Sequence, residues 1–234
     1  PRSLLPKKRL AEAMGRLWRR VRGFWEHDPG LSAILALLVV IVFVLPSFGS
    51  SRGGRGTLFG VAISVLLFAG VAGLRMSRPL RGLLLAVAIA ATVVRWWPSS
   101  GEAAISMASL ASVGLMATVV LAQTFRAGPV NIHRVQGAIA AYLLLGVAWA
   151  FAYELVNVST RGAFAFAHTV APERRGWLYF SFVTLTTVGY GDVTPIHPAA
   201  QSLAMMEALT GQLYPAILLA RLVSLQVQAP ELKR

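Results

Sequence analysis

The stretch TLTTVGYGD, residues 184–192, offers more backbone than side chain for chemistry. Its side chains supply threonine hydroxyls and the Asp192 carboxylate, whereas Gly189 and Gly191 permit backbone dihedrals that other residues adopt only at a steric cost. An extended segment with such dihedrals can turn its carbonyl oxygens to one side, where they replace the water around a dehydrated cation. One copy of the segment supplies only one column of oxygens. We therefore expect copies of the chain to meet around the ion.

The residues on either side predict the elements that position this stretch. Residues 177–187, WLYFSFVTLTT, would form a helix about 16 Å long, half the ~30 Å thickness of the hydrocarbon core of a bilayer. A half-spanning helix followed by irregular backbone occurs at membrane depth only where protein buries it or where it lines water. Long apolar runs at residues 135–157 and 198–226 flank it and can supply that setting.

Residues 186–192, TTVGYGD, resemble the selectivity filter of potassium channels residue for residue. The order of outer helix, pore helix, filter and inner helix over residues 135–226 fits the same family. With its preceding helices, the whole chain is similar to the six-transmembrane potassium channel superfamily, and most resembles its small bacterial members. The resemblance implies a potassium-selective channel with K+ as the permeant ion and no organic cofactor. Because this chain carries one complete filter, a homotetramer is also implied.

The resemblance assigns roles to residues inside the filter. It implies that K+ contacts the carbonyl oxygens of Thr187, Val188, Gly189 and Tyr190. The hydroxyl of Thr187 would lie at the inner end, and Gly191 would complete the ion-binding segment. The side chains of Val188 and Tyr190 would point away from the ion and brace the loop.

Residues around the filter are expected to support it, namely Tyr179, Thr184, Thr186 and Asp192. By resemblance, Asp192 accepts a hydrogen bond from an aromatic donor on the pore helix. Tyr179 occupies the position where many relatives carry tryptophan, so a hydrogen-bond donor is kept but the distance that it can span changes. Val183 stands where some relatives have a buried acid, and this filter should lack that second carboxylate.

The composition is that of a membrane protein. Hydrophobic residues make up 56% of the 234 residues, charged residues make up 13%, and the mean hydropathy is +0.64. Runs of about 20 apolar residues can cross the bilayer as helices. We expect an all-α membrane protein with six such helices and a re-entrant pore helix between the fifth and the sixth: residues 31–48, 57–74, 80–97, 103–125, 135–157 and 198–226.

A net charge of +13 could indicate a nucleic-acid partner, but the distribution of charge favours a membrane. Lys and Arg gather in the segments that would be cytoplasmic if the amino terminus is inside, which predicts that orientation. Six crossings of the cell (inner) membrane then place both termini in the cytoplasm. Residues 7–25 mix basic with large apolar side chains, which indicates a helix on anionic lipids, with a disordered basic tail as the alternative. No nucleic-acid partner is expected.

The chain is divided by function into a cytoplasmic basic amphipathic segment, a four-helix region similar to a voltage sensor, a pore domain and a short cytoplasmic tail: residues 1–30, 31–130, 131–227 and 228–234. A voltage sensor needs several charges inside the membrane field, usually arginines on the fourth helix. Here the fourth helix carries no charge between Glu102 and Arg126 and is rich in small residues that favour close packing. We expect a voltage-insensitive channel, with an unconventional sensor as the alternative.

Three residues of the last helix are candidates for gating. Gly211 and Pro215 predict a bend between them, which is either a hinge or a bend without a gating role. Glu207 lies at membrane depth, where an acid is costly and is by default a functional candidate. It faces either the cavity or the back of the filter, bonded there to pore-helix hydroxyls such as Thr184. The second placement, which we favour, would make it a pH sensor.

Catalysis has no support in the sequence. There is no cysteine, the four histidines have no metal-ligand spacing, and no hydrolase or phosphate-loop pattern is present. We therefore do not expect an enzyme. The hypothesis from a different class is a structural or regulatory membrane subunit whose filter does not conduct.

Overall fold

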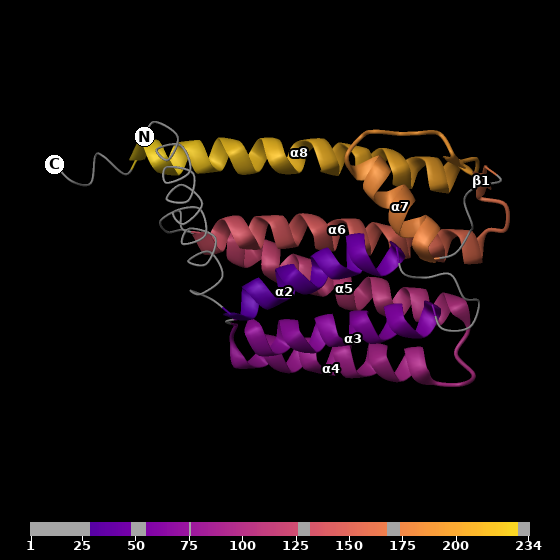
Figure 1. The fold of residues 1–234 in the computed structure, drawn as a ribbon, viewed down its shortest axis with the longest axis horizontal. Coiled ribbons are helices and arrows are strands. Elements are labelled where there is room, and N and C mark those ends of the chain that lie inside the picture. The colour runs from indigo at the N-terminus through magenta and orange to yellow at the C-terminus, as the bar shows by residue number, and fades with distance from the viewer. Residues whose placement is uncertain (1–28, 48–54, 75, 126–131, 168–173, 229–234) are drawn as a thin grey trace, which may run out of the picture.

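The computed structural model describes residues 29–47, 55–74, 76–125, 132–167 and 174–228 (Figure 1). The chain is mainly helical. Its elements are α2 (Pro29–Val39), which continues as a π-helical turn (Val40–Val44) and a 3-10 turn (Leu45–Ser47), then α3 (Arg55–Gly73), α4 (Arg78–Trp96), α5 (Glu102–Thr124), α6 (Ile132–Ser159), β1 (Phe164–Phe166), α7 (Arg174–Leu185), β2 (Val193–Pro195) and α8 (Pro198–Gln228). The all-α prediction omits only the two short strands. The basic segment 7–25 and the tail after residue 228 lie outside the described residues.

Each predicted apolar run is helical where the structure describes it. Four helices are long and apolar enough to cross a membrane: Arg78–Trp96, Glu102–Thr124, Arg134–Ser159 and Pro198–Arg221. Within the described residues, Leu31–Val44 and Thr57–Gly73 are apolar but shorter. The apolar helices make this a membrane protein, and the crossing of all six stays a prediction.

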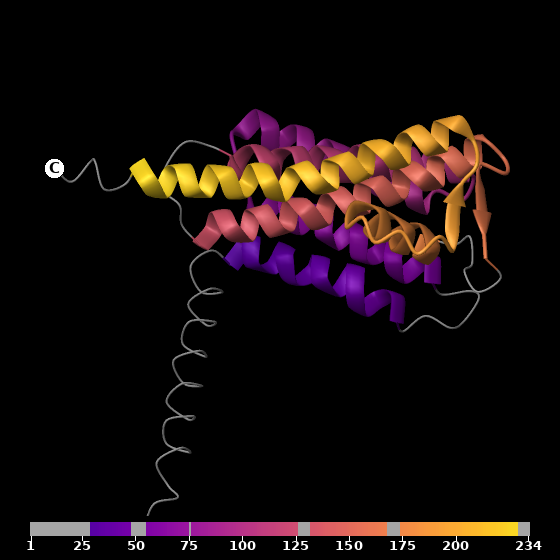
Figure 2. The same cartoon turned by 90° about the horizontal axis from the view of Figure 1, so that it is seen from above.

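Helix α6 joins the two halves of the chain. On one side it packs against α5 and α2, and on the other against α7 and α8. The short helix α7 lies between α6 and α8 near one end of the molecule, next to the strands (Figures 1 and 2). This placement holds the loop that follows α7 against the long last helix.

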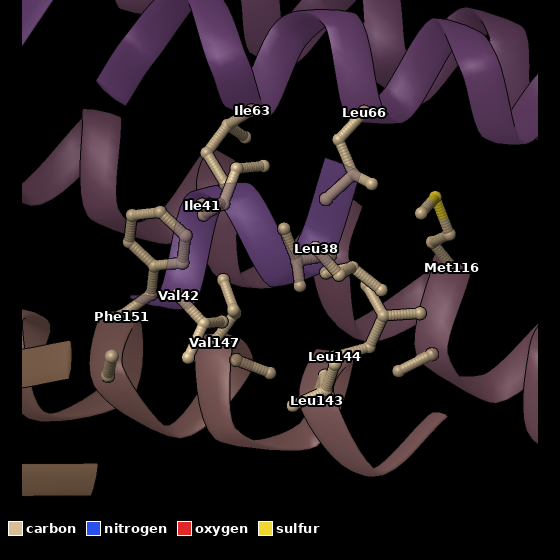
Figure 3. Close-up of a cluster of buried hydrophobic side chains, with 14 of the residues drawn as sticks. Leu38, Ile41, Val42, Ile63, Leu66, Met116, Leu143, Leu144, Val147 and Phe151 are labelled. Carbon is tan, nitrogen blue, oxygen red and sulfur yellow. The ribbon is translucent and has the colours of Figure 1, made fainter. Parts of the chain in front are cut away.

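A buried apolar core fills the space between α2, α3, α5 and α6 (Figure 3). It is built from Leu38, Ile41, Val42, Ile63, Leu66, Met116, Leu143, Leu144, Val147 and Phe151. In lipid the helices associate through close packing rather than through exclusion of water. Gly70 of α3 illustrates this, because a Cβ there would lie 2.5 Å from the sulfur of Met116. The core crosses the predicted boundary at residues 130–131, so the four-helix region and α6 pack as one body.

Helix α8 is a single helix from Pro198 to Gln228, with Pro215 inside it. Its large apolar side chains are mostly exposed in the single chain: Met205, Met206, Leu209, Leu213, Ile217, Leu219 and Val223. The bend expected between Gly211 and Pro215 stays a prediction.

Candidate functional site

The TTVGYGD loop, Thr186–Asp192, follows the carboxyl end of α7 and has an alternating backbone. Thr187, Gly189 and Gly191 have φ of 59°, 57° and 78°, whereas Val188 and Tyr190 between them have negative φ. In a regular strand successive peptide groups point to opposite sides. Alternation of the sign of φ turns every second peptide over, so that successive carbonyl oxygens can face one side. Glycine supplies two of the three left-handed positions without a steric penalty.

Thr187 is the unusual member of this series. A β-branched residue with positive φ is rare, and the left-handed conformation costs about 1–2 kcal/mol. Hydrogen bonds hold it there: its N–H donates to the carbonyl of Thr184 at 2.9 Å, and its Oγ1 accepts from Nε2 of Gln212 at 2.9 Å. The next amide, of Val188, donates to the carbonyl of Val183 at 2.9 Å. The inner end of the loop is thus bound to both α7 and α8.

Gly211 brings α8 against the end of α7. A Cβ at Gly211 would lie 1.8 Å from the carbonyl oxygen of Leu185, a distance that no side chain can occupy. The same oxygen accepts a hydrogen bond from the hydroxyl of Tyr142 on α6 at 3.4 Å. Close packing therefore requires glycine at this position, whether or not α8 also bends there.

At the outer end of the loop, Tyr179 donates a hydrogen bond to Oδ2 of Asp192 at 2.6 Å. This is the bond that the resemblance implied. The hydroxyl is the donor in this bond, because an ionised carboxylate can only accept. The Tyr179 ring also lies parallel to the Tyr190 ring, with centroids 6.4 Å apart. Asp192 additionally accepts the N–H of Val193 at 3.0 Å, so both carboxylate oxygens are bonded.

A two-stranded ribbon anchors the segment after the loop. Strand β2 pairs antiparallel with β1, with Ala165 opposite Thr194, and the N–H of Ala167 donates to the carbonyl of Asp192 at 2.8 Å. Sequence reasoning missed this ribbon because strands of three residues show little periodicity. The aromatic alternation of residues 164–166 and the β-branched pair before Pro195 were the available signals.

Glu207 is 0% exposed and bonds to two other helices. The hydroxyl of Tyr153 on α6 donates to Oε2, and Oγ of Ser181 on α7 lies 2.5 Å from Oε1. Glu207 thus lies between α6 and α7, bonded to the α7 hydroxyl of Ser181 rather than to that of Thr184. Sequence reasoning missed Tyr153 and Ser181, because only the packing shows that their hydroxyls face the acid.

The Ser181 hydroxyl admits two proton arrangements. Its oxygen is also 2.7 Å from the carbonyl oxygen of Gly146 on α6, but a serine hydroxyl has a single hydrogen to donate. If Ser181 donates to Glu207, the Gly146 carbonyl loses this bond. If Ser181 donates to Gly146, Glu207 must carry a proton and donate to Ser181. A change in the protonation of Glu207 can therefore change the hydrogen bond between Ser181 of α7 and Gly146 of α6.

Thr186 and two residues of α8 make local contacts. Thr186 donates its hydroxyl to the carbonyl of Phe182 at 2.6 Å, one turn back on α7. Further along α8, Tyr214 donates to the carbonyl of Ala138 at 2.8 Å. Near the carboxyl end of α8, Arg221 donates to the carbonyl of Phe125, and its guanidinium lies 5.1 Å from that ring centroid. Since Phe125 caps α5, Arg221 ties the last helix to the four-helix region.

Polar groups inside the four-helix region include an arginine of α4 and three serines of α5. Arg95 of α4 donates to Oγ of Ser109 at 2.6 Å, and Ser106, Ser109 and Ser112 are all buried. Helix α5 itself carries no charged residue after Glu102. Sequence reasoning did not place Arg95 in this bundle, because an arginine at the end of an apolar run is typical of the membrane interface.

Comparison with known proteins assigns the segment that builds this site. Residues 140–228, which cover most of α6 and all of α7 and α8, match the family model described as "Ion channel". This segment is similar to ion channel domains. No solved structure matches the chain.

Two curated relatives each match about a third of the chain. "Two pore potassium channel c" of Oryza sativa subsp. japonica is 40% identical over 84 residues, which cover 36% of this chain and 17% of that protein. "Protein LctB" of Bacillus caldotenax is 36% identical over 87 residues, which cover 35% of this chain and 64% of that protein. The chain therefore spans less than two thirds of the length of each relative.

Proposed function

We propose that the chain forms a homotetrameric, potassium-selective channel that conducts K+ passively across the cell (inner) membrane, with both termini in the cytoplasm. The observation that carries the proposal is the alternating backbone of the TTVGYGD loop, with positive φ at Thr187, Gly189 and Gly191. The match of residues 140–228 to ion channels, and the potassium channel named among the relatives, support it.

The proposed ion ligands are the carbonyl oxygens of Thr187, Val188, Gly189 and Tyr190. Oγ1 of Thr187 lies at the inner end of this series. At the other end, Gly191 allows the backbone to turn away from the ion. K+ exchanges its water for about eight carbonyl oxygens in such a filter. One chain supplies one column of oxygens, so four chains around an axis complete each ion cage. Tyr179, Thr184, Thr186 and Asp192 would support the loop.

The exposed side chains of the single chain fit a tetramer. Tyr190 is 70% exposed and Val188 is 53% exposed, although both lie beside the proposed pore. The apolar face of α8, from Met205 to Val223, has no partner among the described residues of its own chain. Further copies in a closed ring would cover both surfaces.

We propose that this channel is not opened by an arginine voltage sensor. Each gating charge is worth ~2.3 kcal/mol per 100 mV, so steep voltage dependence needs several charges in the field. Helix α5 offers none after Glu102. Arg95 is the residue that an unconventional sensor would use, and its bond to Ser109 holds it in place. The basic segment 7–25 is proposed to bind anionic lipids, without charge contacts to nucleic acid.

A flux assay tests the proposed function. Purified protein in liposomes should take up K+ but not Na+, and Ba2+ should block the uptake. The variant Gly189→Ala should abolish uptake while cross-linking still yields tetramers, because alanine adopts the left-handed conformation only with strain. A tetramer that passes no K+ would favour a non-conducting structural or regulatory subunit instead.

A further inference from the structure

Gln212 lies at the inner end of the TTVGYGD loop, and sequence reasoning assigned it no role. It directly follows Gly211, whose missing side chain lets α8 contact the Leu185 carbonyl. Its Nε2 is 2.9 Å from Oγ1 of Thr187, whereas the rest of its side chain is exposed in the single chain. The close packing at Gly211 thus fixes the position from which Gln212 reaches the loop.

The chemistry of this contact decides how the Thr187 hydroxyl is oriented. A hydroxyl has one hydrogen and two acceptor lone pairs, and an amide NH2 group can only donate. The donated N–H of Gln212 therefore occupies one lone pair of Oγ1 and leaves the other for a cation. The backbone of Thr187 is held with φ of 59°, and the bond from Nε2 of Gln212 restrains Oγ1 from the side of α8. Because the amide is neutral, Gln212 adds no net charge beside the ion.

We propose that Gln212 is a positioning residue for the innermost cation site, where it orients the Thr187 hydroxyl so that a lone pair of Oγ1 faces the ion. The inference rests on the proposed function, since the site exists only where four copies of the loop surround a pore. Gln212 does not itself contact the cation. Its removal therefore weakens the innermost site and leaves the carbonyl sites further out unchanged.

Block by Ba2+ from the inner side tests this assignment, because a cation that enters from that side reaches the innermost site first. K+ flux through tetramers in liposomes is measured against Ba2+ concentration for the wild type and for Gln212→Leu, which keeps a similar volume without a donor. Loss of one orienting hydrogen bond should weaken Ba2+ block about tenfold. The ratio of K+ to Na+ flux should stay within about twofold of the wild type.

Two controls separate positioning from general structure. Gln201→Leu removes the same side chain from the same helix, where it bonds the Pro195 carbonyl at 3.3 Å, and should leave Ba2+ block unchanged. In a Thr187→Ala background the hydroxyl is gone, so Gln212→Leu should change Ba2+ block no further. If Gln212→Leu has the same effect with and without the Thr187 hydroxyl, the assignment is wrong.

The outcomes also separate this inference from the proposed function. A wild-type tetramer without Ba2+-sensitive K+ flux would overturn both. A wild type that conducts K+, together with a Gln212→Leu variant that keeps full sensitivity to Ba2+, would overturn the role of Gln212 alone.

Discussion

Glu207 shows how single side chains bind the helices around the site to one another. Its carboxyl group on α8 is bonded by Tyr153 of α6 and by Ser181 of α7. An acid at membrane depth is costly unless its oxygens are bonded, and here both are. The three side chains therefore join the three helices of the segment that matches ion channels.

Two substitutions of Glu207 should distinguish the role of its hydrogen bonds in stability from the role of its titratable proton. Glu207→Leu leaves the Tyr153 and Ser181 hydroxyls buried without their partner, at about 1–3 kcal/mol for each unsatisfied group, so the tetramer should melt at a lower temperature. Glu207→Gln can still accept from Tyr153 and donate to Ser181, and should melt near the wild type. Size-exclusion chromatography after heating measures both variants.

The same Gln variant tests the proposed pH sensor. If protonation of Glu207 changes how Ser181 bonds to Gly146, K+ flux through the wild type should vary with internal pH. Flux through Glu207→Gln should not vary, because the amide cannot change its charge. A variant with the pH response of the wild type would reject the sensor role.

At the outer end of the loop, the hydroxyl of Tyr179 is the atom to test. Tyr179→Phe keeps the ring beside Tyr190 but removes the bond to Asp192, so we expect the ratio of K+ to Na+ flux to fall several-fold. Tyr179→Trp restores an N–H donor and should recover most of the selectivity. Equal selectivity in the wild type and in Tyr179→Phe would show that the bond does not support the loop.

Residue roles were predictable where partners are near in sequence. Tyr179 and Asp192 lie on the helix and the loop that directly follows it, so the local resemblance to potassium channel filters was enough to indicate the bond. Gly189 and Gly191 were predictable because left-handed dihedrals favour glycine. Gln212, Tyr153 and Ser181 were not, since their roles depend on which faces of α6, α7 and α8 meet.

At the scale of elements, the contact between α7 and α8 positions the TTVGYGD loop. Gly211→Ala adds a methyl group where the Leu185 carbonyl lies, so the two helices must separate and K+ flux should fall at least tenfold. In the interior of a helix, alanine is otherwise favoured over glycine by about 1 kcal/mol. Flux and tetramer yield together measure the effect.

Gly114→Ala on α5 is the matched control, because a Cβ at Gly114 meets nothing within 4 Å. It should be neutral or slightly stabilising. If Gly211→Ala conducted as well as Gly114→Ala, the close packing of α8 on the Leu185 carbonyl would not matter for conduction.

The helices were predictable from the long apolar runs, because a run of about 20 apolar residues can cross a bilayer as a helix. The short helix α7 begins a turn earlier than the apolar run and ends at Leu185, because Thr187 leaves the helical region with positive φ. The ribbon of β1 and β2 depends on pairing between segments far apart in sequence. No local pattern in three residues determines such pairing.

Across the whole chain, the four-helix region packs against the segment that carries the TTVGYGD loop. Its core reaches α6 through Leu38 and Val42 of the α2 segment, and Arg221 ties α8 to the end of α5 (Figure 3). The functional division at residue 130 is thus not a division in packing. Helix α5 of this region carries no charged residue after Glu102.

Four copies of this chain are proposed to conduct K+ selectively. The most direct measurement is the reversal potential of current through purified tetramers in a planar bilayer, with K+ varied on one side against a background of Na+. We predict that the reversal potential shifts by about 59 mV for each tenfold change in K+. A reversal potential that does not change with the K+ gradient, or the absence of current from intact tetramers, would contradict the claim.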